Sequence, residues 1–449
     1  MGADPQPLWA LVPPAHRARY LRRAARAVLD DLDGLAALLA EESGQPRTEA
    51  TLAELLPSVG GLHGLADDGP KALADRRLGK VPPLRAGRRS TLVQAPLGTV
   101  GIVVRDGSAW AGPLLEAAAA LLAGNAVRLE AAAPRAAMRM EHAFARAGLP
   151  DGLFATGATG GLEHVVALDP PAAKGTMLLL EGAPLDRAVT GALWAAFAGA
   201  GRRPAAVGRA IAPRAQALAL AAGVEAAARR LRVGDPRDPE TEVGPLASAE
   251  DAARVEALVA AAEREGAARM CGGPVAVAGV AGAFYAPVVL RGVPAGAALL
   301  REPVPGPVLA VVETAGEAEA VALAAGEAGA DGSSGPAGAL SVWAGDSARG
   351  ERVARALGAP IAWVNEHGVA SPAAPVRLAR YVQLCQIASQ PTRLHSARWL
   401  PYDPALVRAA TATAQLVHGR EADRWPALRA NARPLARTAA RLAREALGR

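Results

Sequence analysis

Apolar positions recur along the chain with two different periods, and each period predicts one kind of element. Over residues 17–39 they return every three or four residues, for example at Leu21, Val28 and Leu35, which predicts one amphipathic helix. A further helix is expected over residues 49–63. The chain is therefore predicted to open with a helical region ahead of its first strand.

The segment TLVQAPLGTVGIVV, residues 91–104, has the apolar character of two strands joined by a bend at Pro96 and Gly98. After it the pattern changes to a helix over residues 114–122, a strand over 126–129 and a helix over 134–147. This β-α-β order predicts a parallel sheet covered by helices, because parallel neighbours need a crossover connection.

A second alternating series occupies the middle of the chain and joins the first near residues 170–175. Its expected elements are a strand at 177–180, helices at 185–197, 215–231 and 249–265, strands at 285–290 and 308–312, a helix at 316–325, a strand at 340–344, a helix at 349–357 and a strand at 361–365. Beyond Gly368 the pattern weakens, and two helices are expected at 404–418 and 425–447. The predicted fold class is α/β, with a doubly wound parallel sheet and a second α/β unit.

Composition and charge indicate a globular protein and argue against one that binds nucleic acid. A chain of 449 residues with 51% hydrophobic positions is expected to form two or three globular domains. Residues 420–449 hold eight arginines and three acidic side chains, which is most of the net charge of +6. The rest of the chain is close to neutral, which argues against a nucleic-acid-binding face.

The compartment follows from features that the sequence lacks. Two cysteines, Cys271 and Cys385, are too few for a disulfide framework and suit a reducing compartment. No basic segment followed by an apolar stretch opens the chain, and charged residues interrupt every long apolar run. We therefore expect a cytoplasmic protein without a membrane span.

Several segments, taken together, resemble the aldehyde dehydrogenase superfamily. APLGTVGIV (95–103) is similar to the strand with which that family enters its cofactor domain, and LLAGNAVRLE (121–130) is similar to the following helix, turn and strand. The later segments in family order are RVGDPRDPETEVGPL (232–246), FYAPVVL (284–290), PGPVLAVV (305–312) and WVNEHG (363–368). Because this order holds over residues 17–368, the chain is identified as a degenerate member of the superfamily.

The resemblance implies an architecture, an assembly and a reaction. It implies a degenerate NAD-binding-like domain at residues 1–173 with an oligomerisation hairpin near 86–100, a catalytic-like α/β domain at 174–367, and a C-terminal tail with an arginine-rich helix at 368–449. The hairpin of the family pairs with a late strand of a partner subunit, which implies a homo-oligomer or a hetero-oligomer with an active homologue. In the family a cysteine thiolate attacks an aldehyde, hydrogen-bond donors hold the oxyanion, and hydride passes to a nicotinamide.

The residues of that chemistry are absent from the matching positions. The family's nucleophile pattern F-x-N-x-G-Q-x-C falls on FAGAGRRP, residues 197–204, so Pro204 stands where the cysteine is expected. Proline has neither a thiol nor the backbone N–H that serves as one oxyanion donor in the family. The second donor, an asparagine, falls on Gly107. The loss of one such donor costs about 2.7–4 kcal/mol of transition-state stabilisation. Since both donors and the thiol are missing from the matching positions, we expect no catalytic residue.

The positions of the base and the cofactor are altered too. Only 16 residues separate Gly157 from Lys174, where a mean helix and two strands would need about 22. The helix that meets the pyrophosphate is therefore expected to be missing, and the catalytic glutamate has no counterpart. Glu130 and Gly157 remain as candidate cofactor contacts, since a carboxylate after a second strand binds ribose in other dinucleotide folds. Glu130 could equally be a solvated strand-end charge. We expect no cofactor, or NAD(P) if the protein is active.

No other catalytic motif is found in the sequence. It has no G-x-S-x-G elbow, no phosphate-binding glycine loop, and no pair of histidines at metal-ligand spacing, so no metal site is expected. Arg429, Arg433, Arg437 and Arg441 repeat every four residues along the last predicted helix. They form either a solvated face or a contact for an acidic partner or membrane surface.

Two hypotheses of function remain. The first is an inactive member of the family that acts as a structural or regulatory subunit. The second is an active NAD(P)-dependent oxidoreductase that converts an aldehyde to a carboxylic acid.

Overall fold

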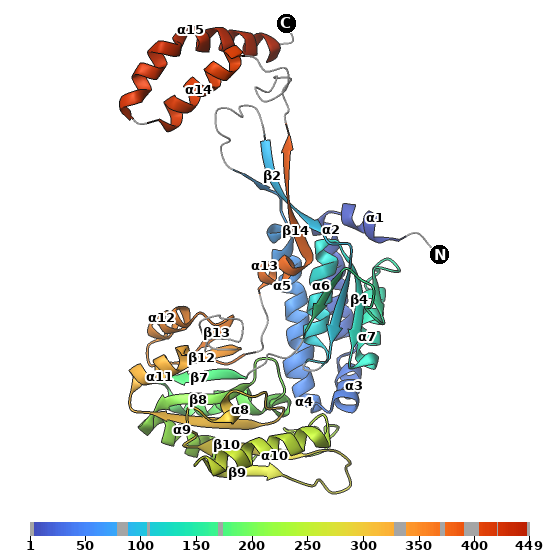
Figure 1. Cartoon of the computed structure of the whole chain (residues 1–449). Helices are drawn as coiled ribbons and strands as arrows, with labels where there is room; N and C mark the ends of the chain where they lie inside the picture. Colours follow the sequence, from blue (N-terminus) through green and yellow to red (C-terminus); the bar gives the residue numbers. More distant parts are fainter. Residues whose placement is uncertain are drawn as a thin grey trace. The chain divides into compact units, whose positions relative to one another are not determined.

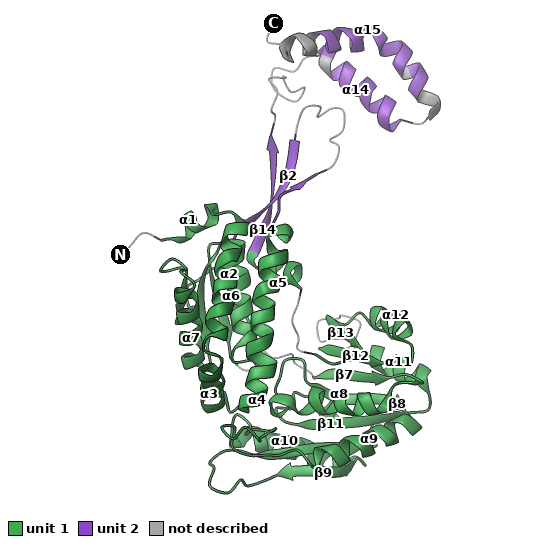
Figure 2. Cartoon of the chain, turned by 180° about the vertical axis from the view of Figure 1, so that it is seen from behind, with its two compact units in different colours: residues 1–72, 97–381 green, residues 73–96, 382–449 purple. Residues whose placement is uncertain are grey.

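The computed structural model describes residues 4–78, 89–105, 108–168, 174–326, 338–368, 373–389, 404–419 and 421–446. The chain divides into two compact units, coloured separately in Figure 2. The main unit combines residues 1–72 with 97–381, and the smaller unit combines residues 73–96 with 382–449. The predicted domain boundary at residue 173 stays a prediction, because residues 169–173 lie outside the described part of the chain.

Helices form the N-terminal part of the main unit (Figure 1). They are α1 (Gln6–Leu11), α2 (Pro14–Leu29), α3 (Leu32–Ser43), α4 (Arg47–Glu49), a π-helical segment (Ala50–Leu55) and α5 (Leu56–Ala72). The prediction of one helix over residues 17–39 is wrong, because the chain breaks at Asp30 and Asp31. These two carboxylates pair with Arg146 and Arg139 of the later helix α7 (Pro134–Arg146). The break therefore places both carboxylates against a neighbouring helix.

The first sheet of the main unit has four parallel strands in the order β5-β4-β3-β6. The strands are β3 (Thr99–Val104), β4 (Ala126–Ala131), β5 (Phe154–Thr156) and β6 (His164–Ala167). Helix α6 (Ala111–Ala123) follows β3, and α7 follows β4, so the predicted β-α-β order is confirmed. Alanine and leucine cover α6 on all sides, which is why this helix is buried along nearly its whole length.

The second sheet has seven strands in the order β13-β12-β7-β8-β11-β10-β9, and all neighbours are parallel except β9 and β10. The strands are β7 (Gly175–Leu179), β8 (Val207–Pro213), β9 (Ala268–Pro274), β10 (Tyr285–Arg291), β11 (Val308–Thr314), β12 (Ala339–Trp343) and β13 (Ile361–Val364). The helices of this part are α8 (Leu185–Phe197), α9 (Arg214–Ala228), α10 (Ala249–Arg264), α11 (Glu317–Ala325) and α12 (Ser347–Leu357). The predicted α/β fold class is confirmed.

Both faces of this sheet are buried, as expected for parallel strands covered by helices. Met177 and Leu179 of β7 pack in one hydrophobic cluster, whereas Leu178 and Leu180 pack in another. Successive side chains of a strand point to opposite faces, so β7 supplies both clusters. Much of the aliphatic content of the sequence lies in these two clusters.

Two strands of this sheet were missed from the sequence, which predicted no strand between residues 181 and 284. Strand β8 lies at the centre of the sheet and carries Arg209. The Arg209 side chain is buried, and its Nε donates to the Thr176 hydroxyl at 2.8 Å. Strand β9 contains two glycines, which are typical of turns. In both cases the tertiary contacts outweigh the local sequence pattern.

The smaller unit contains a three-stranded antiparallel sheet and a pair of helices. Its elements are β1 (Arg76–Arg77), β2 (Arg89–Pro96), β14 (Val382–Ser389), α14 (Pro404–His418) and α15 (Glu421–Ala446). Strand β2 pairs with β1 on one side and with β14 on the other. The resemblance implied that β2 would pair with a late strand of a partner subunit. In this chain the late strand that pairs with β2 is the chain's own β14.

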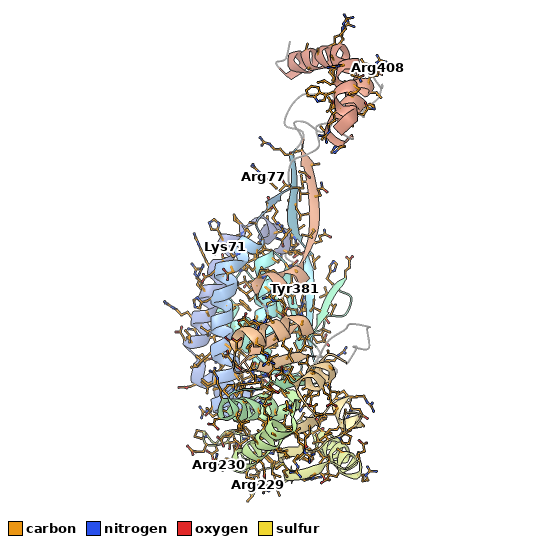
Figure 3. All side chains as sticks on the ribbon, turned by 90° about the vertical axis from the view of Figure 1, so that its left-hand side faces the viewer. Lys71, Arg77, Arg229, Arg230, Tyr381 and Arg408 are labelled. Atoms are coloured by element: carbon orange, nitrogen blue, oxygen red, sulfur yellow. The ribbon has the colours of Figure 1, made fainter. Side chains whose placement is uncertain are left out.

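A buried polar network connects α6 to the short helix α13 (Ala374–Leu378) and the residues after it. The Glu116 carboxylate accepts hydrogen bonds from Arg377 and from the hydroxyl of Tyr381, and both partners are buried. Tyr381 is labelled in Figure 3. Asn125 Nδ2 donates to the Tyr381 carbonyl at 2.9 Å. Burial and the Glu116 carboxylate raise the pKa of Tyr381, so this hydroxyl stays protonated and continues to donate.

Candidate functional site

The loop between α8 and β8 carries the predicted nucleophile position. It begins with a 3-10 turn in which Gly199 (φ 65°), Ala200 (φ 50°) and Gly201 (φ 71°) are all left-handed. This backbone conformation costs about 1–3 kcal/mol for a residue with a Cβ such as Ala200. A Cβ on Gly201 would lie 2.4 Å from the carbonyl oxygen of Gly306, so only glycine fits there. The surrounding structure therefore holds this loop in one conformation.

Pro204 is exposed in the turn that precedes β8. The loop thus presents a pyrrolidine ring, and no N–H, at the position where the family has its cysteine. On one side of Pro204, the Arg203 guanidinium lies 4.7 Å from the centre of the Trp194 ring. On the other side, the carbonyl of Ala205 lies 3.0 Å from Nε2 of His367. Gly107, the predicted second donor position, lies outside the described residues.

Two basic side chains pack beside this loop. Burial, helped by the positive charge of Arg203, lowers the pKa of His367 to about 4, so the imidazole is neutral at pH 7. Lys174 donates to the carbonyl of Gly306, and burial lowers the pKa of its amine to about 7. His367 contacts the carbonyl of Ala205 in the loop, and Lys174 contacts the carbonyl of Gly306, which lies against Gly201. Both side chains therefore help to hold the loop in place.

Glu49 supports the loop from the helical region and was missed by sequence analysis. Its buried carboxylate accepts the N–H of Gly199 and the Nε2 of Gln45, the latter at 3.0 Å. Burial raises the pKa of Glu49, although these hydrogen bonds and the charge of Arg203 act in the opposite direction. Gly199 stands where the family pattern has asparagine, so a carboxylate from α4 now anchors that point of the loop. In the sequence Glu49 only marked the start of a predicted helix.

The carboxyl edge of the four-stranded sheet is where a doubly wound fold binds its dinucleotide. Here the chain's own carboxylates bind both helix N-termini at that edge. Glu54 accepts the N–H of Ala111, the first residue of α6, at 2.7 Å, and the hydroxyl of Ser108 at 2.5 Å. Glu42 accepts the first two amide groups of α7 at 2.7 and 2.8 Å. Anion sites at helix N-termini use these amides, so neither helix offers them to a phosphate.

The two predicted cofactor contacts lie in neighbouring positions at this edge. Oε2 of Glu130, at the end of β4, accepts the backbone N–H and the hydroxyl of Thr159 at 2.8 and 2.9 Å, and these bonds lower the pKa of Glu130. Gly157 follows β5 and donates to the carbonyl of Leu129 at 2.9 Å. Residues 157–163, all of them described, form turns and no helix. Glu130 therefore anchors a turn, and its role toward a cofactor stays a prediction, as does that of Gly157.

A cavity of about 570 Å³ lies between this edge and the loop after α8. Three arginines line it: Arg105 follows β3, and Arg202 and Arg203 belong to the loop. Three acidic side chains and a set of small apolar residues complete the wall. The acidic residues are Glu41, Glu42 and Glu54, and the apolar ones include Val104, Ala109, Pro113, Ala131, Ala132, Ala133, Pro245, Leu246 and Ala247.

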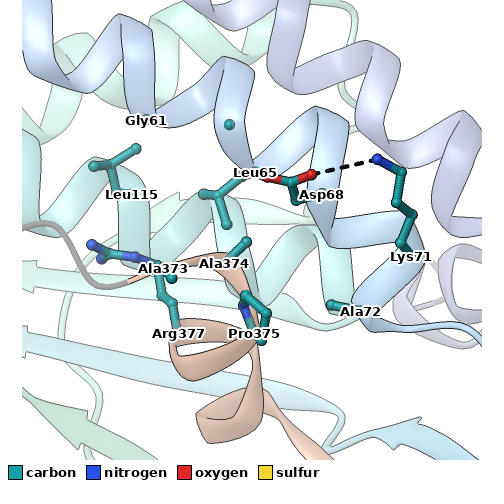
Figure 4. Close-up of a pocket in the computed structure, with 11 residues that line it drawn as sticks. Gly61, Leu65, Asp68, Lys71, Ala72, Leu115, Ala373, Ala374, Pro375 and Arg377 are labelled. Atoms are coloured by element: carbon teal, nitrogen blue, oxygen red, sulfur yellow. Dashed lines mark ion pairs between the residues drawn. The ribbon is translucent and has the colours of Figure 1, made fainter.

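Another cavity, of about 530 Å³, lies between α5, α6 and α13 (Figure 4). Asp68 and Lys71 in its wall pair with each other at 3.5 Å. Arg377 is bound to Glu116. The charged groups of this cavity are thus paired within the protein, and none is arranged as a nucleophile with a neighbouring base.

Neither cysteine lies at the predicted nucleophile position. Cys271 is buried on β9, where burial raises the pKa of its thiol, and it contacts the Pro287 carbonyl. Strand β9 is three strands from β8 in the sheet, which is about 14 Å at about 4.8 Å per strand. Cys385 lies on β14 in the smaller unit. No thiol of the main unit therefore lies at the loop after α8.

Metal-binding and membrane-spanning features were also sought. Over the described part of the chain, no group of three or more His, Cys, Asp or Glu side chains is placed to hold a metal ion. None of the described helices is long and apolar enough to cross a membrane.

Comparison with known proteins identifies the family. The profile of the aldehyde dehydrogenase family matches residues 2–168 and 171–377, so the chain belongs to this family. Among curated relatives, a betaine aldehyde dehydrogenase from Cereibacter sphaeroides is 29% identical over 416 residues, which cover 83% of this chain and 81% of the relative. The match ends before the helices α14 and α15, which lie outside the family profile.

Solved structures share the fold. An NAD-dependent benzaldehyde dehydrogenase from Corynebacterium glutamicum superposes with a TM-score of 0.72 at 21% identity, over 86% of this chain and 87% of that one. The NAD+ complex of an aldehyde dehydrogenase from Bacillus cereus superposes with a TM-score of 0.73 at 21% identity, over 85% of each chain. The family thus includes proteins that bind NAD on this fold.

Proposed function

We propose that this member of the aldehyde dehydrogenase family is catalytically inactive and acts as a structural or regulatory subunit. The observation that carries the proposal is Pro204, an exposed proline at the end of an ordered loop where the family places its cysteine. A proline supplies neither the nucleophile nor its amide donor. Without a covalent intermediate, the family's route from aldehyde to acid has no first step in this chain.

The cofactor site supports the same proposal. A dinucleotide needs free amide groups for its pyrophosphate, and Glu42 and Glu54 already bind those of α7 and α6. A pyrophosphate placed at this edge would also meet two carboxylates of its own sign of charge. The described residues therefore do not fit NAD(P), and we propose that the protein does not bind it as its relatives do.

Assembly is proposed through the smaller unit. Leu384 and Ile387 of β14 are 66% and 55% exposed, and their spacing along the strand places them on opposite faces of the three-stranded sheet. Large exposed apolar side chains on a strand are typical of an interface. We propose a homo-oligomer, or a hetero-oligomer with an active homologue.

The alternative is an active NAD(P)-dependent oxidoreductase that converts an aldehyde to a carboxylic acid. Family membership and the 29% identity to betaine aldehyde dehydrogenases favour it. It would need a nucleophile that replaces the missing cysteine.

Steady-state assays separate the two candidates. Purified protein is incubated with NAD+ or NADP+ and a panel of aldehydes that includes betaine aldehyde, and reduced nicotinamide is measured by absorbance. We expect no formation above the rate without protein. Saturable formation that a thiol reagent abolishes would establish the oxidoreductase instead, and a Cys271→Ser, Cys385→Ser double variant would show whether either cysteine carries it.

A further inference from the structure

We propose that the paired helices α14 and α15 bind the surface of a membrane that contains anionic lipids. The two helices pack against each other in the smaller unit, where Figure 2 shows them side by side. They follow the last residue of the family profile, Arg377, so the family fold does not account for them. The proposal goes beyond the proposed function, because it does not depend on whether the chain is catalytically active.

Positive charge is concentrated in the smaller unit. Its sequence holds 17 basic and five acidic side chains, a net charge of +12. The main unit holds the other 32 basic and 38 acidic side chains, a net charge of −6. An anionic surface therefore attracts the smaller unit and repels the main unit, and this attraction acts over about 10 Å at moderate salt. The contact with such a surface is thus made by the smaller unit.

Three arginines form a line along α15. Arg429, Arg433 and Arg437 are all exposed, and their spacing of four residues places them on one gently drifting face of the helix. Between residues 424 and 444 the sequence contains no acidic residue, and α14 contains none either. Since side chains one turn apart are the usual partners on a helix, no ion pair within these helices neutralises the line. Its charge is available to an external anion.

Exposed apolar side chains lie on the same two helices. Trp425 of α15 is 69% exposed, and Val407 and Val417 of α14 are 46% and 43% exposed. Val417 belongs to the last turn of α14 and Trp425 to the second turn of α15, so both are near the connection between the helices. Helices that bind a bilayer surface carry arginine beside tryptophan and aliphatic side chains, because the interface offers anionic headgroups above an apolar layer.

This combination of side chains favours a membrane over other anionic partners. A nucleic acid would pair with the arginines but offers no apolar layer for the valines. An acidic protein would bind at one compact interface, whereas basic side chains are spread over the helices and the three-stranded sheet, where Arg76, Arg77 and Arg89 are exposed. A membrane is an extended surface that can meet both kinds of side chain.

Co-sedimentation of the full-length protein with vesicles tests the proposal. The vesicles contain phosphatidylcholine and phosphatidylglycerol in equal parts, or phosphatidylcholine alone. At low ionic strength we expect binding to the anionic vesicles to be at least about tenfold tighter than to the neutral ones, and to weaken steeply as salt is added. Absence of binding to the anionic vesicles, or equal affinity for both kinds, would overturn the proposal.

A triple variant locates the charge. Arg429→Gln, Arg433→Gln and Arg437→Gln together should weaken binding to the anionic vesicles about a hundredfold, since each basic side chain near the surface contributes about fivefold. Glutamine keeps a helix propensity close to that of arginine, so the helix should remain intact. Unchanged affinity in a variant that circular dichroism shows to be folded would contradict the role of the line.

The matched control removes the same charge from the main unit. Arg187, Arg254 and Arg355 are exposed on the helices α8, α10 and α12. Their joint substitution by glutamine should leave the affinity for anionic vesicles within about threefold of wild type, because charges beyond the Debye length are screened. Equal losses in the two triple variants would show that net charge decides, and would overturn the assignment to α15.

Trp425→Ala separates a membrane from a soluble polyanion. We expect it to weaken binding to anionic vesicles about fivefold or more, because the indole no longer enters the interface. Unchanged affinity would mean a purely electrostatic contact, which a nucleic acid or an acidic protein could equally make, and would overturn the membrane as the partner. If the triple variant does not fold, this variant and the wild-type comparison of lipids and salt decide the question.

The two proposals fail separately. Vesicle binding is measured without substrate or cofactor, so its absence contradicts the membrane contact and leaves the proposed inactivity as it stands. Aldehyde turnover is measured without vesicles, and its presence would contradict the proposed inactivity alone.

Discussion

The buried network around Glu116 and the loop after α8 differ in what their polar residues contribute. Around Glu116 the carboxylate has a guanidinium and a hydroxyl as partners, and Asn125 joins the same segment through the Tyr381 carbonyl. In the loop, the residues expected to perform chemistry are replaced by glycine, arginine and Pro204. The network has polar groups bound to their partners, whereas the loop has none of the polar groups that the family pattern predicts for catalysis. The comparison is the basis for proposing that the chain acts through its scaffold.

The largest effect is expected in the network. Arg377→Met should lower the free energy of unfolding by about 3 kcal/mol, because it removes the buried cation of Glu116 and leaves only the partly exposed Arg380, at 3.4 Å, to pair with it. Arg135→Met breaks an ion pair whose side chains are 59% and 51% exposed, and should cost less than about 1 kcal/mol. Denaturant unfolding of both variants checks the contrast. Equal losses of unfolding free energy in the two variants would contradict the claim that the buried ion pair matters more than the exposed one.

A pH-dependent effect is expected where His367 meets the loop. The pKa of His367 is lowered from 6.5 to about 4, so the neutral imidazole stabilises the fold above pH 6.5, and this contribution is lost as the pH falls toward 4. At about 1.4 kcal/mol per pKa unit, the loss is about 3 kcal/mol. His367→Gln cannot titrate and should lose less stability than wild type over that range, measured by unfolding between pH 7 and pH 4. Parallel curves would show that the imidazole is not buried as described.

The loop itself should tolerate little change of backbone. Gly201→Ala combines a left-handed φ with a Cβ that would clash with the carbonyl of Gly306, and should cost about 2–3 kcal/mol. Gly161→Ala is the matched control, because its φ is 85° and no atom lies within 4 Å of the added Cβ. It should cost only about 1 kcal/mol. Thermal unfolding of the pair would contradict the account if the two losses were the same.

The smallest effect is expected at the nucleophile position. Pro204→Cys restores a thiol on an exposed turn and should change the free energy of unfolding by less than about 1 kcal/mol. It should also leave the protein without aldehyde turnover, since the proposal assigns no base to this chain and Glu42 and Glu54 still bind the helix N-termini at the cofactor edge. Turnover assays of this variant sharpen the comparison, because activity from one substitution would mean that the rest of the site is intact.

Most of the fold could be predicted from the sequence, because its helices and strands follow apolar periods that local residues determine. Strands β3 and β4 and helices α8 to α12 are examples, whereas the short strands β5 and β6 were not predicted. Strand β8 could not be predicted, because an arginine at its third position fits a buried strand only once Thr176 accepts its hydrogen bond. The break at Asp30 similarly depends on arginines of a distant helix.

The candidate site divides in the same way. The position of Pro204 and the missing helix after β5 could be predicted, because both depend on residue identity and spacing. Glu42, Glu49 and Glu54 could not, since each is an ordinary helical glutamate until folding brings it to amide groups far away in the chain. Glu49 binds an amide group of the loop after α8, and Glu42 and Glu54 bind the amide groups of α7 and α6 at the carboxyl edge of the four-stranded sheet.

The most direct test of the central claim is a single-turnover experiment. Protein is mixed with an equal concentration of NAD+ and an excess of aldehyde, and reduced nicotinamide is followed by fluorescence, with an active family member as the positive control. A scaffold without its nucleophile should form no reduced nicotinamide, whereas the control should form about one per active site. A burst approaching one per chain, lost after treatment with a thiol reagent, would contradict the account.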